Sequence, residues 1–197
     1  GRRLQALTVL TLFLTFDLVL FGAFTRLTDS GLGCPDWPGC YGNASPLGAH
    51  AEITAAQTAM PTGPVTHRKA WVEMVHRYLA TSVGFLILVI TVASWVEYSR
   101  SRAQRGAGAA VSAPVLSPWW PTVTLVWVCI QGAFGALTVT MKLFPAIVTL
   151  HLVGGLVLLF LLCAQAVRRT QIVQAVAPVP VPTAVRRWLW GALVLLS

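Results

Sequence analysis

Residues 145–167 read PAIVTLHLVGGLVLLFLLCAQAV, an apolar run that contains no Asp, Glu, Lys or Arg. A helix of about 20 such residues crosses the hydrocarbon core of a bilayer. Three other runs are of similar length and mostly apolar, at 4–24, 71–95 and 119–139. We therefore expect four membrane-spanning helices that alternate in direction and form an antiparallel bundle.

The overall composition agrees with this expectation, because 56% of the 197 residues are hydrophobic and only 10% are charged. A soluble domain of this length carries more charge. A fifth apolar run starts near residue 188 and covers only about half of a span by residue 197. The predicted fold is an all-α membrane protein, an antiparallel four-helix transmembrane bundle plus the start of a fifth helix. We expect a four-helix N-terminal half at 1–176, with a long loop at 26–70, and then a linker and the truncated start of a second half at 177–197.

Basic residues outnumber acidic ones, which gives the chain a formal charge of +8. The arginines cluster at the N-terminus, in the loop at 97–118, and after the fourth run. These clusters contain Arg2, Arg3, Arg100, Arg102, Arg105, Arg168, Arg169, Arg186 and Arg187. Cytoplasmic segments carry such an excess, so we expect a cytoplasmic N-terminus and an outward-facing loop at 26–70. The partner that this pattern predicts is the lipid bilayer and not a nucleic acid. The composition of 97–118 is typical of a flexible connector.

Two histidines fall inside predicted helices, His76 in the second and His151 in the fourth. Both helices enter from the same face, and each histidine lies about 8 Å from that face. Two imidazoles at one level on different helices could bind one iron axially. Small residues share the helix face of each histidine: Ala80 and Gly84 follow His76, and the glycines at 154–155 follow His151. They leave room for a flat ring, although small residues also serve ordinary helix packing. A closed zinc site is disfavoured, because it would need four ligands.

Two charged residues accompany the first of these histidines on its helix. Glu73 precedes His76 by three residues and so shares its face. The carboxylate could perform proton chemistry, or it could suit the helix N-terminus or pair with Arg77. Arg77 in turn could contact a haem propionate or anchor the helix at the interface.

Two of the four cysteines, Cys34 and Cys40, flank the sequence PDWPG in the outward loop. A disulfide persists in an oxidising compartment, and these positions are close enough in sequence to be bridged. A structural staple and a redox-active pair both fit the sequence. Cys129 and Cys163 lie within apolar runs and are expected to be packing residues.

Three of these segments together resemble the haem A synthase family. They are TRLTDSGLGCPDWPGC at 25–40, WVEMVHRY at 71–78, and TLHL at 149–152. The resemblance implies an enzyme of two similar four-helix halves, each with a histidine pair on its second and fourth helices. Members of the family are haem-dependent membrane oxidoreductases, which oxidise a methyl group of haem O to the formyl group of haem A for cytochrome oxidase assembly.

The resemblance also implies roles for individual residues of this chain. His76 and His151 become the ligands of a haem iron, which makes them the metal-binding residues. Glu73 becomes the catalytic residue that assists the methyl oxidation. Cys34 and Cys40 become the two ends of a disulfide in the outer loop.

The implied cofactor is haem, either haem b or the substrate haem O. We expect this half to hold the substrate, because Glu73 lies beside a ligand. The implied partners are haem O, haem O synthase and an electron donor, and the implied location is the bacterial inner membrane. The alternatives are a bis-histidine membrane cytochrome b that carries electrons, and a quinone-linked thiol oxidoreductase, which would leave the histidines without a purpose.

Overall fold

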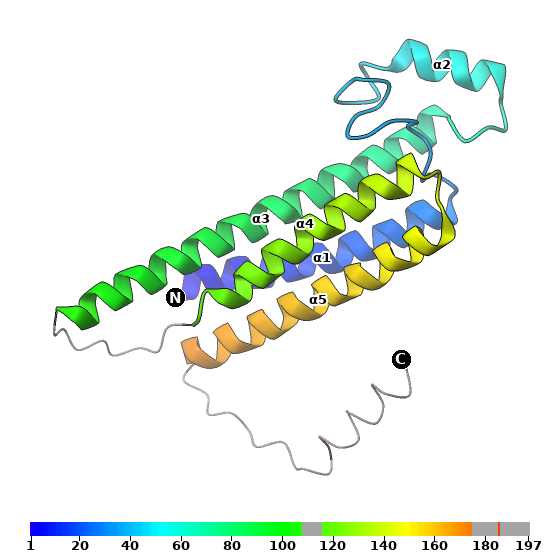
Figure 1. Cartoon of the computed structure of the whole chain (residues 1–197). Coiled ribbons are helices and arrows are strands. Elements are labelled where there is room, and N and C mark those ends of the chain that lie inside the picture. Colours follow the sequence, from blue (N-terminus) through cyan, green and yellow to red (C-terminus); the bar gives the residue numbers. More distant parts are fainter. Residues whose placement is uncertain (108–115, 175–184, 186–197) are drawn as a thin grey trace.

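The computed structural model describes residues 1–107, 116–174 and 185. Over these residues the chain forms four long helices and one short helix (Figure 1). They are α1 (Arg2–Leu27), α2 (His50–Ala59), α3 (His67–Gly106), α4 (Trp119–Thr140) and α5 (Pro145–Gln174). The four long helices are all long and apolar enough to cross a membrane. The predicted fold class is therefore confirmed, and the chain is a multi-pass integral membrane protein. The predicted start of a fifth helix lies outside the described residues.

The four long helices form a closed ring in which successive helices run antiparallel (Figure 1). Helix α1 packs against α3 and α5, and α4 packs against the same two helices. Consequently α1 and α4 are diagonal to each other, and so are α3 and α5. The two helices that carry His76 and His151 thus face each other across the bundle interior.

The two ends of the bundle differ in chemistry. The N-terminus of α1 and the C-termini of α3 and α5 lie at one end, which we call the basic end (Figure 1). This end gathers Arg2, Arg3, Arg100, Arg102, Arg105, Arg168 and Arg169. The connection between α1 and α3, residues 28–66, covers the opposite end, and we call it the loop cap.

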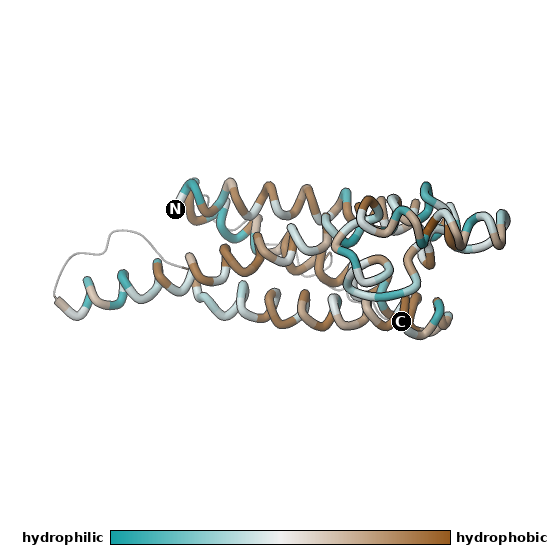
Figure 2. The backbone as a smooth tube through the Cα atoms, turned by 90° about the horizontal axis from the view of Figure 1, so that it is seen from above, coloured by the Kyte–Doolittle hydropathy of each residue, from teal (hydrophilic) through white to brown (hydrophobic). Residues whose placement is uncertain are grey.

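The surface of the bundle is apolar, as a bilayer requires. Phe13, Phe85 and Phe160 are 60%, 63% and 68% exposed, respectively. Figure 2 shows hydrophobic residues along the long helices and more hydrophilic ones in the loop cap. Exposed apolar area of this extent is unfavourable in water and favourable in lipid.

Polar contacts between helices hold the basic half of the interior together. Arg169 on α5 is 6% exposed and donates to the Ser94 hydroxyl on α3 at 2.5 Å. Gln165, one turn along α5, donates to Thr124 on α4 at 2.5 Å. Hydrogen bonds of this kind join membrane helices that have no hydrophobic force between them.

A hydrophobic cluster occupies the next level of the interior, toward the loop cap. It consists of Val83, Ile87, Leu158 and Leu162, all buried. The cluster separates the polar contacts at the basic end from the level of the histidines.

One expectation about a connecting segment was wrong. Helix α3 continues through residues 97–106 to Gly106, so this part of the predicted flexible connector is helical. Its Ala, Gln and Arg residues end the hydrophobic run but have good helix propensity. The predicted loop at 26–70 contains α2, whose alanines favour a helix and whose Ile53 is fully buried.

Candidate functional site

The loop cap is closed by a disulfide between Cys34 and Cys40, whose Cα atoms are 4.9 Å apart. The predicted bond is therefore present in the structure. Both cysteines are 0% exposed and pack with Ile53 of α2 and Met74 of α3. Thiol exchange needs access to the sulfurs, so this burial favours the structural interpretation over the redox one.

Glu73 joins the cap to α3. Its side chain is buried, and its Oε2 accepts a hydrogen bond from the backbone N–H of Cys34 at 2.8 Å. Its Oε1 forms an ion pair with Arg77, one turn along the helix. The Arg77 pairing that the sequence left open is therefore formed, and both carboxylate oxygens have partners.

Arg77 binds the short loop between the two cysteines. Its Nη1 donates to the carbonyl oxygens of Asp36, Pro38 and Gly39 at 2.9, 3.2 and 2.6 Å. The Asp36 carboxylate accepts in turn from the backbone N–H groups of Tyr41 and Gly42. Arg77 thus has a structural role in the cap, and its contact with a haem propionate stays a prediction.

His76 projects from α3 against α1. Its ring lies parallel to Phe21, with centroids 6.3 Å apart and an interplanar angle of 10°. A Cβ atom added at Gly22 would lie 3.0 Å from His76 Nε2. A side chain at position 22 would press on the imidazole, so the glycine lets α1 and the ring pack closely.

His151 projects from α5 against α4 in a similar way. A Cβ atom added at Gly135 would lie 3.4 Å from His151 Cε1 and 4.0 Å from its Nε2. Each helix of the ring therefore contributes one residue to this part of the interior. Two diagonal helices supply histidines, and the other two supply glycines.

The helix register places both imidazoles at about one level. A Cβ atom added at Gly155 of α5 would touch Val19 of α1 at 3.8 Å. His151 on α5 and Ala23 on α1 each lie one helical turn from this contact, on the side of the loop cap. Ala23 is the neighbour of Gly22, which contacts His76.

This arrangement fits a haem better than a bare metal ion. Within the described parts of the chain no group of three or more His, Cys, Asp or Glu side chains could hold a metal ion. A haem iron needs only two axial ligands from the protein, because the macrocycle supplies the others. The glycines at 22 and 135 let the two imidazoles lie close against α1 and α4.

Sequence reasoning missed Gln131, a polar residue of α4 at the same site. Gln131 is buried, and a Cβ atom added at Gly154 would lie only 1.9 Å from its Nε2. Gly154 follows His151 by three residues, and Gln131 precedes Gly135 by four. The signal in the sequence was a glutamine inside an apolar run, but its direction depends on the packing of α4 against α5.

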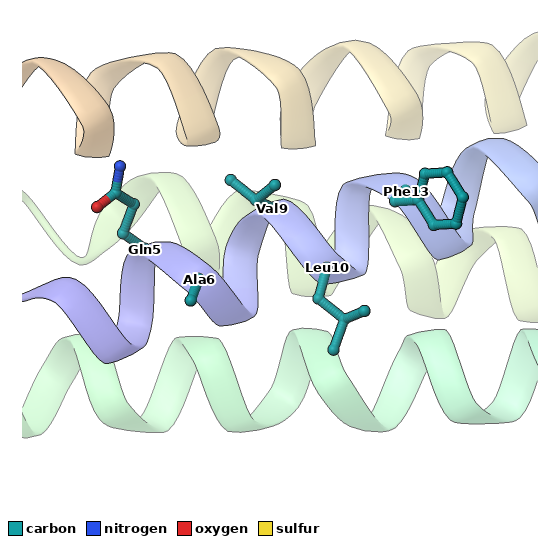
Figure 3. Close-up of a pocket in the computed structure, with 5 residues that line it drawn as sticks. All are labelled: Gln5, Ala6, Val9, Leu10 and Phe13. Atoms are coloured by element: carbon teal, nitrogen blue, oxygen red, sulfur yellow. The ribbon is translucent and has the colours of Figure 1, made fainter.

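The surface also has a shallow hollow of about 530 Å³ that is remote from the histidines. All five of the residues that line it come from the basic end of α1 (Figure 3). They are Gln5, Ala6, Val9, Leu10 and Phe13. Four of the five side chains are apolar, so the hollow belongs to the lipid-facing surface.

The fold and the site define a class of protein: a helical membrane protein whose bundle interior carries a histidine pair beneath a disulfide-bonded cap. The family of cytochrome oxidase assembly proteins named COX15-CtaA matches residues 5–197, and the chain belongs to this family.

Relatives of this chain carry a more specific name. A protein of Shewanella oneidensis named Heme A synthase is 40% identical over 153 residues, which cover 78% of this chain and 42% of that protein. A protein of Lysinibacillus sphaericus with the same name is 30% identical over 163 residues, or 83% of this chain and 44% of that protein. The chain thus spans less than half the length of the curated relatives it matches.

Proposed function

We propose that the protein is a haem A synthase, which oxidises a methyl group of haem O to the formyl group of haem A. This chain supplies its N-terminal four-helix half at 1–176. His76 and His151 would hold the iron of a haem in this half. The observation that carries the proposal is the diagonal pair of histidines at one level of the bundle interior, with glycines on the two remaining helices. The shared name of the relatives supports the reaction.

A bound haem supplies the redox chemistry, and the protein holds and orients it. His76 and His151 fix the position of the ring between α3 and α5. The hydrophobic cluster around Ile87 and Leu158 keeps water away on the side of the basic end. The loop cap covers the opposite side, so the substrate reacts in a site of low dielectric.

Glu73 is the catalytic carboxylate in this proposal. It lies one turn from His76 on the same helix and is buried. Its bonds to Cys34 and Arg77 keep the negative charge in a fixed place. A carboxylate held beside the ring is suited to stabilise positive charge or to accept a proton as the methyl group is oxidised. For this reason we assign haem O to this half and a permanent haem b to the other half.

The orientation and the partners are part of the same proposal. The arginines of the basic end place the N-terminus in the cytoplasm, and the loop cap faces outward from the bacterial inner membrane. Haem O synthase supplies the substrate, a separate donor supplies electrons, and an external oxidant is reduced as the methyl group is oxidised.

The proposal is tested by replacing the ligands in the full-length protein. We expect His76→Ala and His151→Ala each to lose the haem of this half and to stop the conversion of haem O. The measurement is extraction and chromatography of the pigments from the purified variants. Normal haem content and normal haem A in both variants would refute the ligand assignment.

One observation favours a second function, a membrane cytochrome b that carries electrons. Both oxygens of Glu73 already have structural partners, so the carboxylate could serve the cap alone. The two functions differ in their product. A haem A synthase yields haem A when it is expressed with haem O synthase, whereas an electron carrier leaves haem O unchanged.

A further inference from the structure

Gln131 has an unused hydrogen-bonding atom in the histidine site. Its side chain is 7% exposed, and its Oε1 is buried without a partner in the described parts of the chain. A buried amide oxygen without a hydrogen bond costs free energy, so such an atom calls for an explanation.

His151 has a matching unused atom. Its Nδ1 is also buried without a hydrogen bond of ordinary distance and angle among the described residues, and the backbone carbonyl of Gln131 lies near the ring as a competing acceptor. A histidine that binds a metal through one ring nitrogen nearly always donates a hydrogen bond from the other, which fixes the ring orientation and raises the basicity of the ligand.

The surrounding polar groups of α4 are already engaged. Trp127 Nε1 donates to the carbonyl of Gly154 at 2.9 Å, and the Thr138 hydroxyl donates to the carbonyl of Gly135 at 2.7 Å. Gln131 lies between these two contacts along α4. The absence of a side chain at Gly154 gives its amide room beside α5, next to His151.

We propose that Gln131 is the positioning residue of His151, and that its amide oxygen accepts a hydrogen bond from Nδ1–H in the haem-loaded protein. This proposal rests on the proposed function, since it assumes that His151 Nε2 binds the iron. The hydrogen bond satisfies two buried atoms at once and selects the tautomer that leaves Nε2 free for the metal.

The test compares three variants of the full-length protein. Gln131→Leu removes the acceptor, and Gln131→Glu replaces it with a stronger, charged one. Gln165→Leu is the matched control, because Gln165 is a second buried glutamine with a free Oε1, but it lies on the other side of the hydrophobic cluster. Two quantities are measured. The first is the rate of haem transfer to apomyoglobin, and the second is the reduction potential of the haem that the His151→Ala variant lacks.

The two Gln131 variants are expected to shift the potential in opposite directions. Loss of the acceptor makes His151 a weaker donor to iron, which destabilises the oxidised state, so Gln131→Leu should raise the potential. Gln131→Glu should lower it. Gln131→Leu should also release haem roughly tenfold faster, as is usual when the partner of a metal-binding histidine is lost.

The possible results separate the two levels of the proposal. If Gln131→Leu matches Gln165→Leu in both haem release and potential, the Gln131 side chain does not position His151, and the proposal is overturned in favour of the Gln131 backbone carbonyl. If His76→Ala and His151→Ala both retain all of their haem, the ligand assignment of the proposed function fails, and this inference fails with it.

Discussion

At the scale of single residues, Glu73 has two roles that a suitable pair of variants can separate. Glu73→Gln keeps an oxygen for the Cys34 N–H but removes the charge, whereas Arg77→Gln breaks the same ion pair and keeps the carboxylate. We expect Glu73→Gln to retain haem at this site and to lower the conversion of haem O by roughly 100-fold or more, which is typical of a missing acid–base group. The measurement is the ratio of haem A to haem O in extracted pigments. If Arg77→Gln lowers the conversion equally, the carboxylate serves the cap and not the chemistry.

Gly22 provides a second prediction at this scale. A Cβ atom there would lie 3.0 Å from His76 Nε2, so Gly22→Val should displace the imidazole. Overpacking costs about 1–3 kcal/mol, which corresponds to a loss of haem affinity of roughly tenfold or more. Gly132→Val is the matched control, because a Cβ atom at Gly132 meets nothing within 4 Å and the residue is exposed on α4. Equal haem contents of the two variants, measured by pyridine haemochrome absorbance, would show that His76 does not bind the haem where we place it.

The sequence was most informative about residues whose chemistry is rare in a membrane. A histidine inside an apolar run is unusual enough to be noticed, so His76 and His151 could be selected without a structure. Glu73 could be placed on the face of His76, but its bond to the Cys34 N–H joins residues that are remote in sequence. The direction in which the Gln131 side chain points could not be predicted, because it depends on the rotation of α4 about its own axis.

At the scale of elements, the disulfide and the Glu73–Arg77 pair attach the loop cap to α3. A bridge that closes so short a loop contributes about 2 kcal/mol by restricting the unfolded chain. We expect Cys34→Ser to make the cap sensitive to protease while the four long helices persist. Limited proteolysis followed by mass spectrometry gives the readout, and Cys129→Ser, which removes an exposed free cysteine, is the control. Equal protection of the cap in both variants would mean that the disulfide does not hold it.

Elements were predictable where hydrophobicity alone defines them. The four spans appeared at nearly their observed positions, because each one must fill the thickness of the bilayer with apolar residues. Helix α2 and the extension of α3 to Gly106 have no such requirement. These two helical segments depend on helix propensity and on single buried contacts such as that of Ile53. Neither produces a strong hydrophobic pattern in the sequence.

At the scale of the whole molecule, the bundle has a definite polarity. Most of the arginines among the described residues gather at one end, and the disulfide-bonded cap lies at the other (Figure 1). A disulfide needs an oxidising compartment, and an arginine excess favours the cytoplasm. These two indications are independent, and they give the same orientation.

This orientation can be tested with single cysteines on either end of the bundle. Ala55 on α2 and Ser99 near the C-terminal end of α3 are both exposed. In spheroplasts, a membrane-impermeant maleimide should label Ala55→Cys at once and Ser99→Cys only after the membrane is opened. The unaltered protein is the control, since its free cysteines, Cys129 and Cys163, lie within the spans. Labelling of Ser99→Cys in intact spheroplasts would reverse the topology and place the histidine site near the cytoplasmic face, where the cap could not keep its disulfide.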